Sequence, residues 1–310
     1  MITISQSNDE EVRILCEEVY NNLDRKYRKN LDEWCKIRVS SILQRILGRT
    51  FSDKPFLDIM LLSFNELNEL SKDINFTKLN YMFSIVNNKK IKNKKVKSIK
   101  DYLIDNVYKA ISIKKRRRKI LSITNLSVCP YCNRNFMNSS ENNNTCELDH
   151  FFHKSKFPIL AASFYNLIPS CPSCNRNKST NDFLLSPYNN EISTDNRITF
   201  SWRPKYGDFF YNHNSIEILS IPHEKYKNDF SILDLNGLYQ IHSDLVLDML
   251  LKKIFIPDTY LNEISKMMPL SNDDINRLYT GVYTTEKEYY KRPLSKFISD
   301  IYKEFDNLER

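Results

Sequence analysis

The segments CPYC, residues 129–132, and CPSC, residues 171–174, decide the fold that we expect for this chain. Each is a C-x-x-C pair, which can place two thiolates on one ion through a tight turn, and four such ligands form the closed tetrahedral site of structural zinc. Two pairs, both with proline after the first cysteine, are much stronger evidence than one pair, although coincidental thiols or a redox pair are the alternatives. We therefore predict a structural zinc site with the ligands Cys129, Cys132, Cys171 and Cys174.

The other three of the seven cysteines carry no such pattern. Cys16 and Cys35 stand alone in a region of helical spacing, where a buried thiol acts as a small apolar side chain, and Cys146 is interpreted as a packed thiol that binds no metal. Free thiols fit the reducing cytosol better than disulfides do. The first residues lack a basic segment followed by an apolar one, and no apolar run reaches membrane-spanning length. We therefore expect a cytoplasmic protein without membrane contact.

The positive charge of the chain is concentrated in one segment. Residues 89–119 contain fourteen Lys or Arg and two acids, a local charge of +12 in a chain whose net charge is +8. Such a surplus favours contact with a phosphate backbone over a merely solvated loop, and the scarcity of aromatic residues in the segment argues against base reading. The block KKRRRK supplies the expected contacts Lys114, Lys115, Arg116, Arg117, Arg118 and Lys119.

Apolar spacing and breaker residues predict a mainly helical α+β fold. Helical periodicity covers residues 12–23, 31–47, 56–70 and 99–111, and later residues 243–266, 272–278 and 294–308. Strands are expected at residues 197–202 and 215–221. Four regions follow: an N-terminal helical region (1–88), a basic linker and helix (89–126), a domain with paired cysteines (127–190), and a mixed, mainly helical C-terminal region (191–310).

The residues between the two cysteine pairs contain Asp149 directly before His150. A divalent ion needs hard oxygen ligands, which Asp149 supplies and to which the amide oxygen of Asn175 can add. His150 points to the other side of an extended strand and can accept a proton from water near neutral pH. Taken singly, such residues are more often satisfied surface, turn or cap residues. Their combination within a double knuckle favours a catalytic site.

The order of Asp149-His150, Asn166 and Asn175 between two C-x-x-C pairs resembles the HNH nuclease family, in its H-N-N form with a four-cysteine zinc knuckle. The resemblance covers residues 127–190 and implies a ββα-metal core. It implies that His150 and Asn166 are catalytic residues, with Asn166 bridging the long loop and orienting His150. It also implies that Asp149 and Asn175 bind a catalytic Mg²⁺ or Mn²⁺, and that Asn175 opens the helix behind this ion.

The resemblance predicts a metal-dependent HNH endonuclease that hydrolyses phosphodiester bonds in DNA. Arg176 and Lys178 are expected to meet phosphate, although ordinary surface charges would fit these positions equally well. The role of His153 is left open: the residue either belongs to the site or is an ordinary surface residue. Two other functions also stay open: a zinc-dependent nucleic-acid-binding protein without catalysis, and an RNA-cleaving, toxin-like HNH nuclease.

A wider resemblance concerns three stretches, LDHFFHKSKFP, SFYNLIPSCPSCN and KRPLSKFISDIY, the last of which lies near the C-terminus. Together they are similar to bacterial HNH proteins encoded beside ATPases in anti-phage loci, such as the Septu-type nuclease component. This similarity implies a role in anti-phage defence and an ABC-type or SMC-like ATPase as partner.

Overall fold

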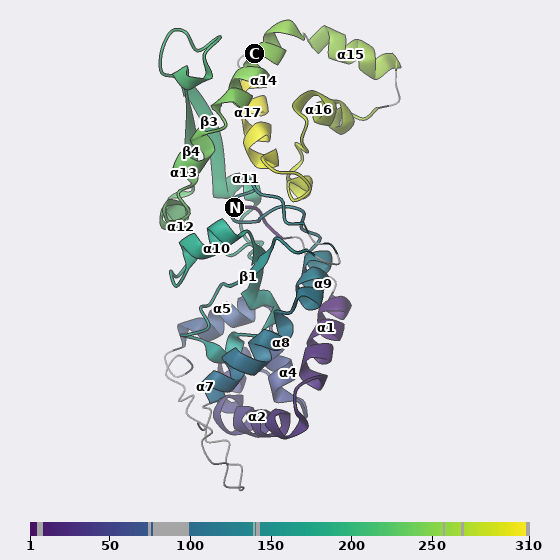
Figure 1. Cartoon of the computed structure of the whole chain (residues 1–310), viewed down its shortest axis with the longest axis vertical. Coiled ribbons are helices and arrows are strands. Elements are labelled where there is room, and N and C mark those ends of the chain that lie inside the picture. Colours follow the sequence, from purple (N-terminus) through teal and green to yellow (C-terminus); the bar gives the residue numbers. More distant parts are fainter. Residues whose placement is uncertain are drawn as a thin grey trace.

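Helices dominate the structure, which is a computed structural model. Within the part of the chain that the structure describes, the strands form two small antiparallel sheets. The predicted class, α+β and mainly helical, is confirmed. Helices α1 to α5 lie at one end of the molecule, β3 and β4 with α14 and α17 lie at the other, and β1 and α10 lie between them (Figure 1). The residues that the structure describes are 1–4, 9–73, 76, 99–138, 140, 143–256, 258–267 and 270–307.

Two of the three helical stretches predicted in the N-terminal region, residues 31–47 and 56–70, are each divided between two shorter helices. The helices of this region are α1 (Asp9–Asn21), α2 (Arg25–Arg38), α3 (Ser40–Leu47), α4 (Pro55–Met60) and α5 (Phe64–Lys72). Ser63 caps α5 from an extended backbone and forms a capping box with Glu66. Since an N-cap residue has non-helical dihedral angles, one continuous helix over residues 56–70 is ruled out.

The predicted helical stretch 99–111 is confirmed as a continuous run of α7 (Ile99–Tyr102), the π-helical η1 (Leu103–Tyr108) and α8 (Lys109–Ile111). The block KKRRRK does not end this helical region, as we expected, but forms the beginning of a further helix, α9 (Lys114–Thr124). This helix ends at Asn125, whose φ of 50° is left-handed. The Lys-rich residues 89–98 of the basic segment lie outside the described part of the chain.

A hairpin and a helix follow one another between the cysteine pairs. Strand β1 (Glu147–His150) pairs antiparallel with β2 (Leu167–Ser170), so that Asp149 faces Ile168. The connecting loop contains the short helical turns η2 (Pro158–Leu160) and η3 (Phe164–Asn166). Helix α10 (Pro172–Lys178) starts directly after β2 and packs against β1. Proline at its first position suits the fixed φ and the missing N–H of that residue.

The C-terminal region contains the two predicted strands, β3 (Ile198–Pro204) and β4 (Ile216–Pro222), paired antiparallel. The expected helix over residues 243–266 is split, because the sequence has proline at position 257, which has no N–H and crowds the preceding turn. The other elements are α11 (Thr194–Arg197), η4 (His213–Ser215), η5 (Glu224–Tyr226), α12 (Lys227–Ile232), α13 (Leu235–Gln240), α14 (Ser243–Phe255), α15 (Asp258–Met267), α16 (Asn272–Thr280), η6 (Glu286–Glu288) and α17 (Ser295–Asn307).

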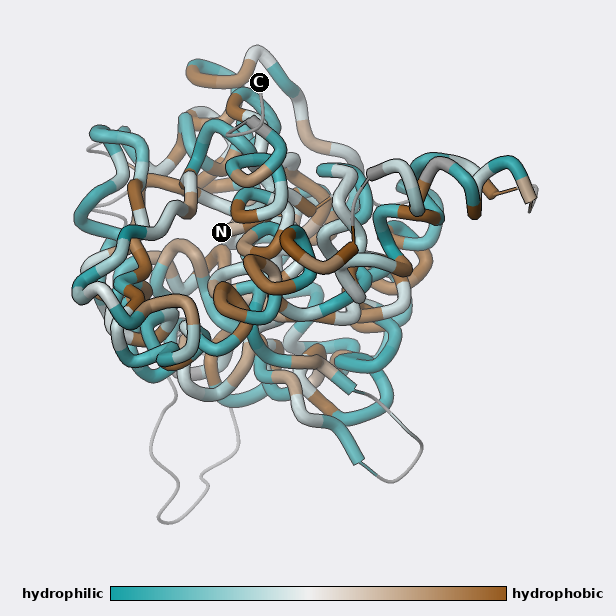
Figure 2. The backbone as a smooth tube through the Cα atoms, turned by 90° about the horizontal axis from the view of Figure 1, so that it is seen from above, coloured by the Kyte–Doolittle hydropathy of each residue, from teal (hydrophilic) through white to brown (hydrophobic). Residues whose placement is uncertain are grey.

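One apolar core joins residues from every part of the chain that the structure describes. Hydrophobic segments gather toward the middle of the molecule when it is seen from above (Figure 2). Residues 1–4 run through this interior, where the Ile2 N–H donates to the Pro130 carbonyl (2.7 Å) and the Ile4 N–H donates to the Pro187 carbonyl (2.8 Å). Among the described residues, no helix combines the length and the apolar composition needed to cross a membrane.

The C-terminal region also holds the first cysteine pair in place. Asn133, which follows Cys132, has a left-handed φ of 50° and donates from Nδ2 to the Tyr289 carbonyl (2.9 Å). Its Oδ1 accepts from the Lys296 N–H (3.1 Å), and the Tyr239 hydroxyl donates to the Cys132 carbonyl (2.6 Å). The first knuckle is therefore fixed by residues that lie more than a hundred positions away in the sequence.

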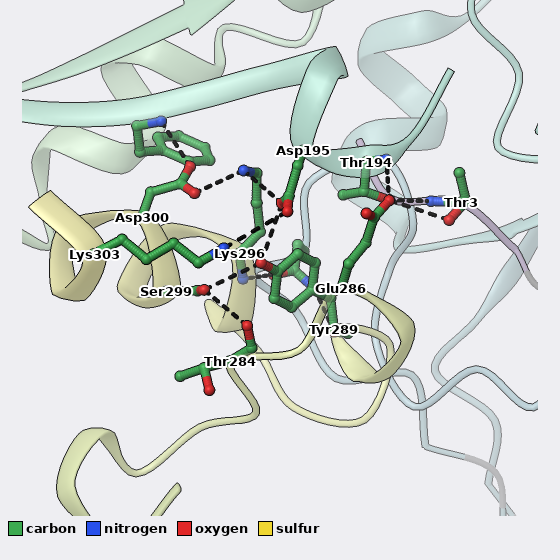
Figure 3. A network of polar contacts seen from close by, with 12 residues as sticks. Thr3, Thr194, Asp195, Thr284, Glu286, Tyr289, Lys296, Ser299, Asp300 and Lys303 are labelled. Atoms are coloured by element: carbon green, nitrogen blue, oxygen red, sulfur yellow. Dashed lines mark hydrogen bonds and ion pairs between the residues drawn. The ribbon is translucent and has the colours of Figure 1, made fainter. Parts of the chain in front are cut away.

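Lys296 is the centre of a buried polar network that joins α11, β3 and α17 (Figure 3). Its ammonium lies 2.9 Å from Asp195 Oδ1 and 2.7 Å from Asp300 Oδ1. The other oxygen of Asp300 accepts from the Phe200 N–H (2.9 Å), and the Tyr289 hydroxyl donates to Asp195 (3.1 Å). Each carboxylate therefore has several partners, as a buried ion pair requires.

Removal of the Lys296 charge should destabilise the fold. Lys296→Met leaves Asp300 buried without its countercharge, so we expect the free energy of unfolding to fall by about 3–5 kcal/mol. Lys303 offers a matched control, because its ammonium also approaches Asp195 (3.6 Å) but its side chain is 51% exposed. Lys303→Met should cost less than about 1 kcal/mol. Urea denaturation of both variants measures the difference, and equal losses would contradict the assigned role of Lys296.

Candidate metal centre and active site

The four predicted zinc ligands come together in one buried cluster. The Sγ atoms of Cys129, Cys132, Cys171 and Cys174 all lie within 4.8 Å of one another. The first pair occupies a tight turn that the left-handed Asn133 closes, and the second pair lies at the start of α10, with Cys171 as N-cap. Four thiol groups at this spacing can hold one metal ion, and thiolate ligands in a closed set of four suit zinc.

Neighbouring N–H groups point at the sulfur atoms of the cluster. The Cys171 N–H donates to Cys129 Sγ (3.3 Å), the Arg134 N–H donates to Cys132 Sγ (3.4 Å), and Asn135 Nδ2 donates to Cys171 Sγ (3.3 Å). Such donors stabilise thiolates and orient them, as outer-shell partners of a metal site do. The donor set therefore fits a bound ion better than four neutral thiols.

The three remaining cysteines lie outside the cluster and are buried, in agreement with their interpretation as packed thiols. Burial raises the pKa of Cys16 to about 12 and that of Cys146 to about 11, and it raises the pKa of Cys35 as well. These thiols are therefore protonated and unreactive at neutral pH.

Metal content tests the cluster. We expect one zinc per chain for the wild type, and loss of that zinc together with partial unfolding for Cys171→Ser, because ligand binding at such a site is also folding free energy. Cys146→Ser is the matched control, since Cys146 is also a buried cysteine of this region but is not a member of the cluster. It should keep the zinc. Elemental analysis decides, and a metal-free, well-folded wild-type protein would rule out the zinc site.

Asp149 and His150 point to opposite faces of β1, as expected for neighbouring residues of a strand. Asp149 faces α10, where its Oδ2 lies 3.1 Å from the Lys178 ammonium and accepts a hydrogen bond from the Tyr131 hydroxyl (2.6 Å). Burial raises the pKa of Asp149, while the charge of Lys178 and the Tyr131 hydroxyl lower it. The predicted metal ligand thus lies in a closed environment with a cation already in contact.

Lys178 is 0% exposed and also donates from Nζ to the His150 carbonyl (2.8 Å). The ammonium of Lys178 is therefore not placed as the predicted phosphate contact, because a fully buried group does not face a ligand in solution. Arg176, one turn away from the helix start, is exposed, and its Nε donates to the Pro172 carbonyl (3.3 Å). Of the two cations predicted on α10, Arg176 therefore faces solvent and Lys178 faces the interior.

His150 is buried against η1 and the loop between the strands. Its Nε2 lies 3.0 Å from the Ala161 carbonyl oxygen, and its ring centroid lies 4.5 Å from that of Tyr108. Since a carbonyl only accepts, Nε2 carries the proton and the lone pair is left on Nδ1. Burial lowers the pKa of His150 to about 3, so the imidazole is neutral at neutral pH. A neutral ring with an available lone pair can accept a proton.

Asn166 joins the two ends of the long loop after His150. Its Oδ1 accepts from the Phe152 N–H (2.7 Å), and its Nδ2 donates to the carbonyls of Phe152 (3.2 Å) and Leu160 (2.9 Å). Leu160 precedes Ala161, whose carbonyl holds the His150 ring. The fully buried Asn166 side chain therefore fixes the residue next to the one that orients the imidazole.

Asn175 lies within α10, which begins three residues earlier, at Pro172, and not at Asn175 as the resemblance implies. Its Nδ2 donates to Glu147 Oε2 (2.6 Å). Glu147 lies two residues before Asp149 and so on the same face of β1. The structure thus brings Asn175 and Lys178 of α10 against Glu147 and Asp149 of the strand.

Several of the residues around this site were not predicted from the sequence. They are Tyr108, Tyr131, Glu147, Lys154 and Ala161. Lys154 places its ammonium 4.4 Å from the ring centroid of Tyr108, the residue whose ring also packs against His150. Of these five, only Glu147 carried a sequence signal, because it alternates with Asp149. His153, whose role the sequence left open, contacts Ser155 Oγ through Nδ1 (2.7 Å) and is partly exposed.

The six basic residues at the start of α9 do not form one uniform surface. Lys114 and Lys115 are exposed, whereas Arg116 is buried and binds Glu18 (3.2 Å) and the Ala110 carbonyl (2.7 Å). Arg117 donates to the Cys146 carbonyl (3.3 Å). Arg118 and Lys119 are partly exposed, with Lys119 lying 3.8 Å from Glu18. Arg116 therefore holds α9 against α1, and its side chain does not face solvent as the predicted nucleic-acid contact would.

Comparison with known proteins identifies the class to which this region is similar. Residues 129–181 match the family model described as HNH endonuclease. The matched segment contains both cysteine pairs, β1, β2 and α10. No curated protein and no solved structure matches the chain.

Proposed function

We propose that this protein is a metal-dependent HNH endonuclease that hydrolyses phosphodiester bonds in DNA, with residues 127–190 as its catalytic domain. The observation that carries the proposal is the match of residues 129–181 to HNH endonucleases, which includes the neutral His150 held by the Ala161 carbonyl beside Asp149. In this reading β1, β2 and α10 are the ββα-metal core, and the four cysteines hold structural zinc.

His150 is the proposed general base. Its Nδ1 has no hydrogen-bond partner among the described residues and carries the lone pair that can take a proton from an attacking water. Asn166 and the Ala161 carbonyl fix the ring, so that the lone pair keeps its direction. Burial keeps the ring unprotonated at neutral pH, and the same lowered pKa makes it a weaker base than a solvated histidine.

Asp149 and Asn175 are the proposed ligands of a catalytic Mg²⁺ or Mn²⁺. Three oxygen contacts around the Lys178 ammonium, from both Asp149 oxygens (3.1 and 3.3 Å) and from the His150 carbonyl (2.8 Å), make a position suited to a cation. When bound, such an ion supplies positive charge that stabilises the phosphate in the transition state. The oxygen donors of this face are the hard ligands that Mg²⁺ and Mn²⁺ prefer.

The wider proposals rest on resemblance and charge. Residues 1–88, 89–126 and 191–310 form the flanking regions of the nuclease domain, and the exposed part of α9 follows the phosphate backbone. A role in anti-phage defence, with an ABC-type or SMC-like ATPase as partner in the cytoplasm, belongs to the same proposal. It is supported by the similarity of the stretches quoted above to bacterial HNH proteins of such loci.

Cleavage assays test the catalytic assignment. We expect the wild type to cut plasmid DNA with Mg²⁺ or Mn²⁺ and to lose activity in EDTA, and we expect His150→Ala to reduce the rate by about 10²–10⁴-fold, because a general base contributes that much. His153→Ala is the matched control, a histidine three residues after His150 that contacts Ser155. Zinc content and circular dichroism should be unchanged in both variants.

The same assay separates the alternative functions. Full activity of a folded His150→Ala variant would remove His150 from the mechanism. Binding of DNA without cleavage in any metal would favour the zinc-dependent binding protein, and cleavage of total RNA with intact plasmid would favour the RNase.

The salt dependence of DNA binding tests the basic helix. Replacement of Lys114, Lys115 and Arg118 by Gln should weaken binding equally for unrelated sequences, because each lost phosphate contact lowers the slope of log affinity against log salt by about 0.9. The control replaces Lys205, Lys225 and Lys227, three exposed lysines of the C-terminal region, and removes the same charge. Slopes that change equally in both triple variants would show a general charge effect and remove α9 from the interface.

A further inference from the structure

The buried ammonium of Lys178 occupies the place where the proposed function requires a metal ion. Its Nζ lies 3.1 Å from Asp149 Oδ2, 3.3 Å from Asp149 Oδ1 and 2.8 Å from the His150 carbonyl oxygen. A divalent ion that binds Asp149 would use the same carboxylate oxygens. Two cations at contact distance from one buried carboxylate repel each other strongly in a poorly solvated site, so each weakens the binding of the other.

We propose that Lys178 and the catalytic divalent ion compete for Asp149, so that displacement of the Lys178 ammonium is the event that opens the metal site. This inference rests on the proposed function in one respect, the assignment of Asp149 as an ion ligand. It makes Lys178 a positioning residue that holds the strand and the helix together when no ion is bound.

The surroundings of Lys178 favour such an exchange. Lys178 is the last residue of α10, and the next residue, Ser179, leaves the helix with a φ of 47°, so no further helical turn follows the lysine. The ring of Phe183 forms one wall, with its centroid 5.5 Å from Nζ. An aromatic face stabilises a cation only weakly, so the carboxylate supplies most of the attraction.

A second buried acid lies within electrostatic range of Lys178. Burial raises the pKa of Asp229 to about 6, whereas hydrogen bonds from the N–H groups of Leu185 and Leu184 and the charge of Lys178 lower it. Asp229 Oδ2 accepts both of those N–H bonds, at 2.8 and 2.9 Å, while Oδ1 has no partner among the described residues. The Lys178 ammonium therefore interacts electrostatically with Asp229 as well as with Asp149.

Metal binding measured without substrate tests the competition. In the zinc-loaded full chain, Lys178→Met removes the competing charge, so we expect Mn²⁺ to bind at least about tenfold more tightly, since an unpaired buried carboxylate gains strongly from a new counterion. Lys156→Met is the matched control, an exposed lysine of the same domain that pairs with Asp182 and should leave the affinity unchanged. Asp149→Asn should abolish this binding with either residue at position 178. Electron paramagnetic resonance of free Mn²⁺ gives the affinities.

A measurement on the wild type covers the case in which Lys178→Met does not fold. A buried, ion-paired lysine is protected from acetylation, and displacement by Mn²⁺ should raise the labelling of Lys178, read by mass spectrometry, while that of Lys156 stays constant. Unchanged Mn²⁺ affinity of a folded Lys178→Met variant, or a Lys178 that stays protected at saturating Mn²⁺, overturns the inference. Neither readout needs cleavage, so a protein that binds Mn²⁺ as expected but does not cut nucleic acid would contradict only the proposed function.

Discussion

The four-cysteine cluster is the constraint on which the rest of the central region depends. It joins two segments that are separated by 38 residues in the sequence, between Cys132 and Cys171, and it fixes the start of α10 relative to the turn that follows Val128. Because Cys171 is the N-cap of this helix, the cluster also sets the direction in which α10 crosses β1. The small hairpin of β1 and β2 would be only marginally stable by itself, since two strands bury little apolar surface.

Distant parts of the chain support this small unit. The first knuckle, residues 129–133, accepts hydrogen bonds from or donates them to Ile2, Tyr239, Tyr289 and Lys296. Two buried lysines then act as internal crosslinks, Lys178 between α10 and β1 and Lys296 between α17 and α11. Each is tolerated in the interior because carboxylates neutralise its charge, and removal of either partner leaves a buried charge unpaired.

The candidate site combines a rigid histidine with a closed acidic position. His150 is held by hydrogen bonding and ring packing on one face of β1, while Asp149 is held by Tyr131 and Lys178 on the other. The two side chains therefore differ in whether a charged group already contacts them. The imidazole is neutral and oriented by the Ala161 carbonyl, whereas the Asp149 carboxylate is already paired with the Lys178 ammonium.

Sequence alone determined the features that depend on residue identity and spacing: the cluster of four cysteines, the alternation of Asp149 and His150 on a strand, the strands β3 and β4, and the mainly helical class. These follow from local periodicity and from the chemistry of cysteine. It did not determine the division of the predicted helix 56–70 at Ser63, the burial of Arg116 and Lys178, or the contact of Asn175 with Glu147. Those were decided by tertiary structure, because whether a charged side chain faces water or a buried carboxylate depends on which distant element packs over it, and no local pattern records that.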